Sequence, residues 1–247
     1  SLESTHERGQ VMRKPLSGLV VAVGLIAALG TGSAALGATA LPVFEDFETY
    51  SVGQNMDTAA NWFTNAAGGS AVAQTTNVLS ATKACTTSLS DLTLDVDETS
   101  GDYSNIWSQI YAKPTLYDDT VPPAAPDGTV SCAFYVNTSS EVVAYSGSSW
   151  SNLGAITTGD FLQFVVHSDY VNDKWDLFIS DDATAGTAAR RLNGSALSHN
   201  NAFAGSELTE VTVEGIATLD AIALAIGNDD INLRRSNVIV CAKTMTA

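Results

Sequence analysis

The sequence has little positive charge. Lys and Arg together number only 11 among 247 residues, against 27 Asp and Glu, and the formal net charge is -16. A nucleic-acid-binding surface needs clustered basic side chains, so this balance excludes DNA and RNA as partners. All charged residues together make up 15% of the chain, below the roughly 25% of an average soluble domain. This low fraction excludes a coiled coil and a charge-rich disordered chain.

Catalytic and metal-binding sequence motifs are also missing. The chain has no His-Glu-x-x-His zinc motif, no Gly-x-Ser-x-Gly nucleophile motif and no Cys-x-x-Cys pair. His167 lies in an apolar run, which is typical of a core residue, and His199 lies in a polar loop, which is typical of solvent exposure. Cys85, Cys132 and Cys241 are odd in number, and their spacing favours no particular disulfide.

The N-terminal residues indicate export. Arg13 and Lys14 precede an apolar stretch, Leu19–Leu29, and the small residues Ala38–Ala40 follow. A positive end, a short apolar centre and small residues before a cleavage point are the parts of a secretory signal peptide. The apolar stretch is about half as long as the roughly 20 residues of a membrane span.

These features divide the chain into three parts. We expect residues 1–11 to be an upstream extension, residues 12–40 to be a signal peptide cleaved after Ala40, and residues 41–247 to be one folded domain. The protein is then expected to be secreted or held at the cell surface, with no membrane span after cleavage. At about 100–200 residues per domain, the remaining length suits one sandwich-sized domain.

Short apolar runs, rather than helical periods, fill the expected domain. They show two-residue alternation or β-branched and aromatic content, and Gly, Asn, Asp and Ser separate them. About ten such strands predict an all-β fold, a two-sheet antiparallel sandwich. The expected strands are Val43–Phe47, Ala71–Val78, Leu89–Val96, Ile106–Lys113, Thr129–Val136, Val142–Tyr145, Phe161–Ser168, Lys174–Ser180, Glu210–Glu214, Thr218–Ala225 and Asn237–Ala242.

Three of these segments carry a family pattern. The first is Val43–Gly53 with Trp62 after it, the second is the hairpin Phe161–Ile179, and the third is Thr218–Leu224, of the type apolar-Asp-x-apolar. Together they resemble the concanavalin A-like, laminin-G-like jelly-roll domains of secreted bacterial proteins. The resemblance implies a jelly-roll sandwich. Lectins, glycanases and inert surface modules all use this fold, so it implies no single function.

A jelly-roll glycoside hydrolase is the enzymatic alternative. Retaining glycosidases need two carboxyl groups about 5–5.5 Å apart, and the resemblance to laminarinase-like enzymes would place them in a Glu-x-Asp-x-x-Glu motif. The sequence lacks this motif, Glu45–Glu48 has the wrong spacing, and Asp95 and Asp97 share a face as solvated acids would. We therefore expect no catalytic residues. Three further acids are spaced so that a strand would scatter them over both faces: Glu207, Glu210 and Glu214.

Aromatic residues beside polar ones point to carbohydrate. Exposed rings stack on sugar faces while Asn, Asp and Gln bind the hydroxyl groups. Tyr145 and Trp150 flank a Ser/Gly-rich hairpin tip, Trp107 and Tyr111 share a strand parity, and Tyr117 precedes two Asp residues. We expect a non-catalytic module that binds a polysaccharide or glycan surface at these residues. The alternatives are a cross-strand pair that only stabilises the hairpin, and a structural or adhesive surface protein without a sugar site.

The resemblance also implies a calcium ion. Jelly-roll binding modules often hold a structural Ca²⁺ where the first and last strands meet, using a Glu after Phe and an Asp of the closing strand. Glu48, which follows Phe47, and Asp220 match these positions, with Asp46 as a third candidate. Carboxylate oxygens are the ligands that Ca²⁺ prefers. Ala221 is a departure, because the family often carries a second acid there.

Overall fold

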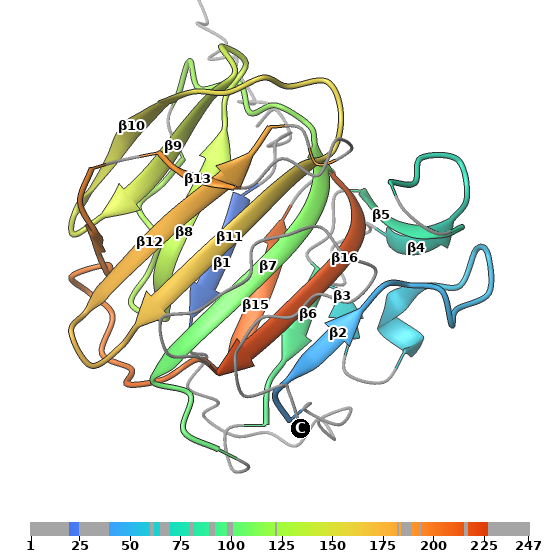
Figure 1. The fold of residues 1–247 in the computed structure, drawn as a ribbon, viewed down its shortest axis with the longest axis horizontal. Coiled ribbons are helices and arrows are strands. Elements are labelled where there is room, and N and C mark those ends of the chain that lie inside the picture. Colours follow the sequence, from blue (N-terminus) through green and yellow to red (C-terminus); the bar gives the residue numbers. More distant parts are fainter. Residues whose placement is uncertain are drawn as a thin grey trace, which may run out of the picture.

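Two β-sheets packed face to face form the described part of the chain (Figure 1). Apart from a 3-10 turn at Met56–Thr58, the regular elements in this part are strands, and no helix in it is long and apolar enough to cross a membrane. The computed structural model describes residues 20–24, 40–59, 62–64, 70–79, 82–88, 92–97, 101–121, 123–181, 183, 189–192, 194–214 and 217–226.

One sheet has seven strands and the other has nine. Every strand pair in both sheets is antiparallel, which confirms the sandwich that the sequence predicts. The seven-stranded sheet has the order β10 (Ser149–Ala155), β9 (Glu141–Ser146), β8 (Val130–Val136), β1 (Val20–Gly24), β15 (Glu210–Glu214), β6 (Leu92–Asp95) and β3 (Trp62–Thr64).

The main path of the nine-stranded sheet is β13 (Arg190–Arg191), β12 (Lys174–Ser180), β11 (Leu162–Asp169), β7 (Asn105–Pro114), β16 (Ala217–Ile226), β5 (Ala84–Ser88) and β4 (Ser70–Gln74). Two short strands pair beside this path: β14 (Leu197–Ser198) with β12, and β2 (Val43–Glu45) with β16.

The core lies between the sheets. Alternate residues of β11 and β12 point inward, including Phe164, Val166 and Trp175, and they pack against Phe134 and Val211 of the other sheet in one apolar cluster. Trp175 is buried. Burial of such side chains contributes roughly 1.5–3 kcal/mol each, so this cluster holds the two sheets together.

The first and closing segments meet as the family resemblance implies. In β2, Glu45 is opposite Ile222 of β16, and Val43 is opposite Leu224. The predicted hairpin between β11 and β12 is also present, and Asp169 accepts hydrogen bonds from the main-chain N–H groups of its turn. Both features agree with the jelly-roll sandwich that the family resemblance implies.

Several boundaries differ from the sequence prediction. The strand expected at Ala71–Val78 ends at Gln74, because the Gln74 side chain accepts a hydrogen bond from the Asn77 N–H at 3.0 Å and donates one to the Asn77 carbonyl at 2.8 Å. These bonds fold the chain into a turn. β5 was not predicted, since its Thr and Ser residues carry little apolar pattern. The expected strand Asn237–Ala242 lies outside the described residues.

β1 lies inside the region predicted to be the apolar centre of the signal peptide. It pairs with β15 on one side, with Val20 opposite Glu214, and with β8 on the other, with Val20 opposite Tyr135. It is therefore an inner strand of the seven-stranded sheet. Cleavage after Ala40 would remove it and leave the facing edges of β8 and β15 without main-chain partners.

We expect a chain that begins at Leu41 to unfold at a lower temperature than the full chain, because it lacks the ladders on both sides of β1. Amide protons in β8 and β15 should exchange faster in the shorter chain, as measured by mass spectrometry. A chain that begins at Met12 keeps β1 and serves as the control. Equal melting temperatures and equal exchange in all three chains would show that β1 adds nothing to the sheet.

Candidate functional site

The side of the nine-stranded sheet that faces away from the core carries several polar side chains among apolar ones. Residues that alternate with the core positions of β7, β11, β12 and β16 point to this side, and the strand register brings them together. We call it the outer face. It is defined by Trp107, Gln109, Tyr111, Gln163, Val165, His167, Asp176, Phe178, Ala221, Ala223 and Ala225.

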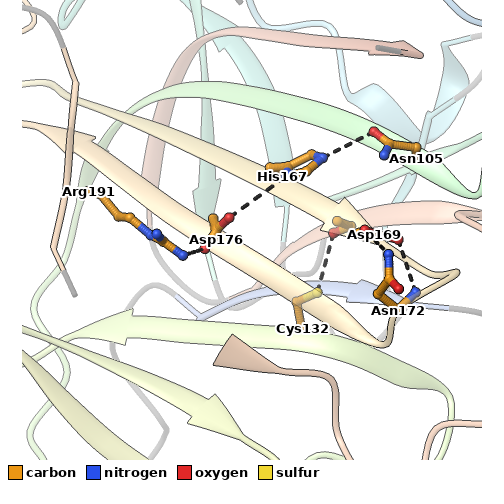
Figure 2. A network of polar contacts seen from close by, with 8 residues as sticks. Asn105, Cys132, His167, Asp169, Asn172, Asp176 and Arg191 are labelled. Carbon is orange, nitrogen blue, oxygen red and sulfur yellow. Dashed lines mark hydrogen bonds and ion pairs between the residues drawn. The ribbon is translucent and has the colours of Figure 1, made fainter. Parts of the chain in front are cut away.

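A chain of polar contacts crosses the outer face (Figure 2). The Arg191 guanidinium of β13 bonds to Asp176 of β12, whose other carboxylate oxygen lies 3.8 Å from Nδ1 of His167. The opposite ring nitrogen of His167, Nε2, is 3.1 Å from the side-chain oxygen of Asn105. The side chains of His167, Asp176 and Arg191 are 17%, 20% and 32% exposed, so a ligand can reach them from solvent.

Trp107 lies directly against this polar chain. Its ring stacks on that of His167 with centroids 4.2 Å apart and an interplanar angle of 18°, and Phe178 is tilted against it at 5.9 Å. His167 is therefore on the outer face rather than in the core where the sequence pattern placed it. Of the aromatic residues that the sequence analysis named, Trp107 is the one that stacks on His167.

Two buried donors on the outer face have no hydrogen-bond partner among the described residues. They are the indole N–H of Trp107 and the side-chain amide nitrogen of Gln163. A buried polar group left unpaired costs about 1–3 kcal/mol. Both groups are buried, so a ligand that approaches from solvent does not reach them.

One end of the outer face is closed. Tyr111, opposite Gln163 in the register, packs with Phe161, Ala183 and Leu79 in a separate apolar cluster, and its hydroxyl accepts a hydrogen bond from Gln109 at 2.9 Å. Tyr111 is buried there. The Tyr111 end of the outer face is therefore buried. The other end is exposed and is formed by His167, Asp176 and Arg191.

The other predicted aromatic residues gather on the seven-stranded sheet. Trp150 makes edge contacts with Tyr145 at 5.1 Å and with Tyr135 at 5.2 Å, and Tyr117 is 4.9 Å from Tyr135. The three tyrosines are buried and Trp150 is half-buried. The sequence analysis missed Tyr135, whose strand alone does not show which neighbours it meets.

The proline-containing loop after residue 118 covers this aromatic cluster. The indole N–H of Trp150 donates to the carbonyl of Pro123 at 3.1 Å, and the Tyr117 hydroxyl donates to the carbonyl of Val121 at 3.1 Å. Edge contacts and hydrogen bonds therefore occupy much of these rings. The hairpin pair Tyr145 and Trp150 is directly opposite in the register, as the stabilising alternative required.

Replacing Trp150 with Ala should lower the free energy of unfolding by about 2 kcal/mol. This is less than the roughly 3–5 kcal/mol of a fully buried Trp, because Trp150 is only half-buried. Urea denaturation measures the change. Trp150→Phe keeps most of the ring contacts and should lose less. An unchanged free energy for Trp150→Ala would show that the ring is free to stack on a sugar.

The residues expected to bind calcium make hydrogen bonds within the chain. The Glu48 carboxylate accepts hydrogen bonds from the Thr82 hydroxyl at 2.6 Å and from the main-chain N–H groups of Thr82 and Lys83 at 2.8 and 2.6 Å. These hydrogen bonds lower the pKa of Glu48. Asp220 accepts from the N–H of Leu79 at 2.8 Å, and Asp46 accepts from the N–H of Glu48. Asp220 and Glu48 thus hold the main chain at Leu79 and at Thr82–Lys83, respectively.

Within the described part of the chain, no three His, Cys, Asp or Glu side chains are grouped so that they could hold a metal ion. The structural calcium ion therefore stays a prediction that rests on the family resemblance.

An acidic pair on the seven-stranded sheet escaped the sequence analysis. Glu210 of β15 is directly opposite Asp95 of β6 in the register. Burial raises the pKa of Glu210 to about 7, with a further contribution from the Asp95 carboxylate, and burial also raises the pKa of Asp95. Thr93 and Thr212 lie next to the pair and hydrogen-bond to each other at 2.9 Å.

Glu210 should make stability fall as the pH rises. Its folded pKa lies above its unfolded value of about 4.5, so its contribution is complete below pH 4.5 and is lost as the pH rises through 7. Allowing for solvent screening of a partly exposed carboxyl, we expect a loss of about 1–2 kcal/mol. Urea denaturation between pH 5 and 8 should show this slope in the wild type and not in Glu210→Gln.

Glu141→Gln is the matched control for that experiment, because hydrogen bonds from Asn137 and Asn152 lower the pKa of Glu141 instead. This variant should keep the wild-type slope above pH 5. The same slope in Glu210→Gln as in the wild type would show that Glu210 titrates normally.

The remaining titratable candidates are buried. Cys85 and Cys132 are free thiols whose pKa values burial raises, that of Cys132 to about 12, and the Cys132 sulfur lies 3.4 Å from the Ser168 hydroxyl (Figure 2). Cys241 lies outside the described residues. The prediction of an exposed His199 is wrong: the ring is buried against Tyr170, and burial lowers its pKa to about 4.

Comparisons with known proteins reveal structural likeness only. No known family model and no curated protein sequence matches the chain. A solved sialidase is similar at 6% identity and a TM-score of 0.46, over 74% of this chain and 18% of that protein's length. The catalytic domain of a family 131 glycoside hydrolase from Coprinopsis cinerea is similar at 12% identity and a TM-score of 0.36, over 60% and 74%.

A third similar structure is the receptor-binding domain of botulinum neurotoxin mosaic serotype C/D. It is 9% identical, with a TM-score of 0.37, over 71% of this chain and 44% of that one. The chain thus spans less than half the length of the sialidase and of the toxin domain. At these scores the likeness carries no argument about function, and the candidate site stands on its own geometry.

Proposed function

We propose that this chain is a secreted, non-catalytic carbohydrate-binding module whose ligand is a polysaccharide or glycan surface. The binding site is the exposed end of the outer face, at His167, Asp176 and Arg191, with Trp107 beside them. The observation that carries the proposal is the polar chain that runs from Arg191 to Asn105 next to a stacked indole.

The chemistry of the group suits sugar hydroxyls, which both donate and accept hydrogen bonds. Asp176 accepts, Arg191 donates, and His167 can do either according to its tautomer. Each of these side chains is held by another, so little side-chain freedom is lost when a ligand binds.

A glycoside hydrolase is the second candidate, and the Asp95–Glu210 pair favours it. Two carboxyl groups on directly opposite residues, one with a pKa near 7, have the relation of acid and base that glycosidases use. Thr93 and Thr212 lie beside the pair, rather than the aromatic and charged groups of the outer face. Binding at the outer face therefore remains the first proposal.

The test is retention of the secreted protein on immobilised cellulose, chitin, xylan, β-glucan and pectin. At least one polysaccharide should retain the wild type. Arg191→Ala should bind it about 10–100 times more weakly, which corresponds to the loss of hydrogen bonds to a charged group. Arg190→Ala is the matched control. Arg190 pairs with Asp181 and lies opposite Ile179, a core residue, so its side chain points away from the outer face.

Each outcome points to one reading. Retention that Arg191→Ala and Arg190→Ala weaken equally would place the site elsewhere. An absence of retention on every polysaccharide would favour a structural or adhesive protein without a sugar site. Release of reducing ends by the wild type, lost in Glu210→Gln, would establish the hydrolase.

A further inference from the structure

We propose that His167 is the proton switch of the outer face: the protonated ring holds Asp176 and Arg191 in one polar chain, and loss of the proton breaks the chain at Asp176. This inference rests on the proposed function, because these three residues form the proposed sugar site. It follows from the groups that surround the two ring nitrogens.

Both ring nitrogens of His167 face oxygen atoms (Figure 2). Nε2 is 3.1 Å from the side-chain oxygen of Asn105, and Nδ1 is 3.8 Å from a carboxylate oxygen of Asp176. Amide and carboxylate oxygens accept hydrogen bonds and donate none. A neutral imidazole has one N–H and one lone pair, so it would turn its lone pair toward one of these oxygens. The protonated ring presents an N–H to each.

The stacked indole of Trp107 adds to this preference. Trp107 is directly opposite His167 in the β7–β11 register, and the ring centroids are 4.2 Å apart at an interplanar angle of 18°. The face of a Trp ring attracts a cation more strongly than the other aromatic faces do. Because the N–H groups lie in the plane of the imidazole, stacking leaves both of them directed at their oxygen partners.

The charged groups near the ring, among the described residues, are two acids and two bases. Asp176 of β12 is directly opposite it, and Asp169, two residues along β11, is coupled to it electrostatically. Arg191 of β13 is bonded to Asp176, and the Lys174 ammonium of β12 donates to a neighbouring hydroxyl. β7 places only uncharged side chains on this side. The carboxylate at Nδ1 therefore favours the protonated ring.

Asp176 joins the two ends of the polar chain. One of its oxygens bonds to Arg191 and the other faces Nδ1 of His167. In a neutral ring whose hydrogen stays on Nε2, the Nδ1 lone pair faces a carboxylate, and the two groups repel each other. Asp176 is partly exposed, so it can turn toward solvent and take the Arg191 guanidinium with it. The sugar site then loses the order that keeps the entropy cost of binding low.

Nitrogen chemical shifts report the protonation of each ring nitrogen separately. In the free full-length protein, His167 should be doubly protonated at about pH 5.5 and protonated at Nε2 alone at about pH 8.5. His167→Gln assigns its signals. His199 is the internal control, because burial lowers its pKa to about 4 and its ring should stay neutral throughout. A His167 ring that is neutral at the lower pH, as a reversed Asn105 amide would permit, overturns the inference.

A charge variant separates Asp176 from the general acidity of the protein. Asp176→Asn should lower the pH at which His167 loses its proton, because the amide carries no charge to stabilise the protonated ring. Asp181→Asn is the matched control, since that carboxylate pairs with Arg190. It should leave the titration of the ring as in the wild type. The same titration in the wild type and in Asp176→Asn contradicts the proposed contact.

Retention on the polysaccharide that binds the wild type is the second readout. Binding should weaken about fivefold from pH 5.5 to 8.5, a coupling of ordinary size. By reciprocity, soluble fragments of that polysaccharide should raise the pH at which His167 loses its proton by about 0.7 unit. His167→Gln has no ring proton to lose and should bind equally at both pH values.

The outcomes separate the switch from the sugar site. Glu210 also titrates near pH 7 and is still present in His167→Gln, so an undiminished pH dependence in that variant belongs to other groups and overturns the inference. Retention that depends on Arg191 but not on pH leaves the proposed function standing without the switch. A wild type that no polysaccharide retains at either pH overturns the proposed function, while the titration of the ring still decides whether His167 holds the polar chain.

Discussion

The hydrogen-bonded ladder between β7 and β16 positions both the core and the outer face of this protein. The inward side chains of these two long strands enter the core, and their outward side chains form half of the outer face. Because side chains alternate along a strand, a slip of one residue would exchange the two sets. The bulge at Asp220 is the one place where this ladder departs from regular pairing, and it supplies the carboxylate that fastens the neighbouring turn.

The two sheets use aromatic residues in different ways. On the seven-stranded sheet, Trp150 and its tyrosine neighbours contact one another edge to face and hydrogen-bond to a covering loop. These contacts stabilise the fold. On the nine-stranded sheet, Trp107 stacks on a histidine that is itself part of a polar chain open to solvent. Aromatic residues therefore form a structural cluster on one sheet and part of a candidate binding site on the other.

What the sequence could predict depended on how local the signal was. Two-residue alternation identified β11, β12 and the hairpin that joins them, because each depends on residues close together in the chain. The same reasoning grouped Trp107 with Tyr111 by parity but could not place His167 beside Trp107, since that contact needs the β7–β11 register. The Asp95–Glu210 pair and the bulge at Asp220 were invisible for the same reason: each exists only once particular strands are neighbours.

The alanines of β16 set how readily this surface can change. Ala221, Ala223 and Ala225 present single methyl groups beside the long side chains of β7, with Ala223 opposite Gln109 and Ala225 opposite Trp107. All three are buried in the apolar cluster with Tyr111 and Phe161, so a valine or leucine in this row would have to displace its neighbours. This row of methyl groups is therefore the part of the sheet that tolerates the least increase in side-chain volume, and the close packing beside β7 depends on it.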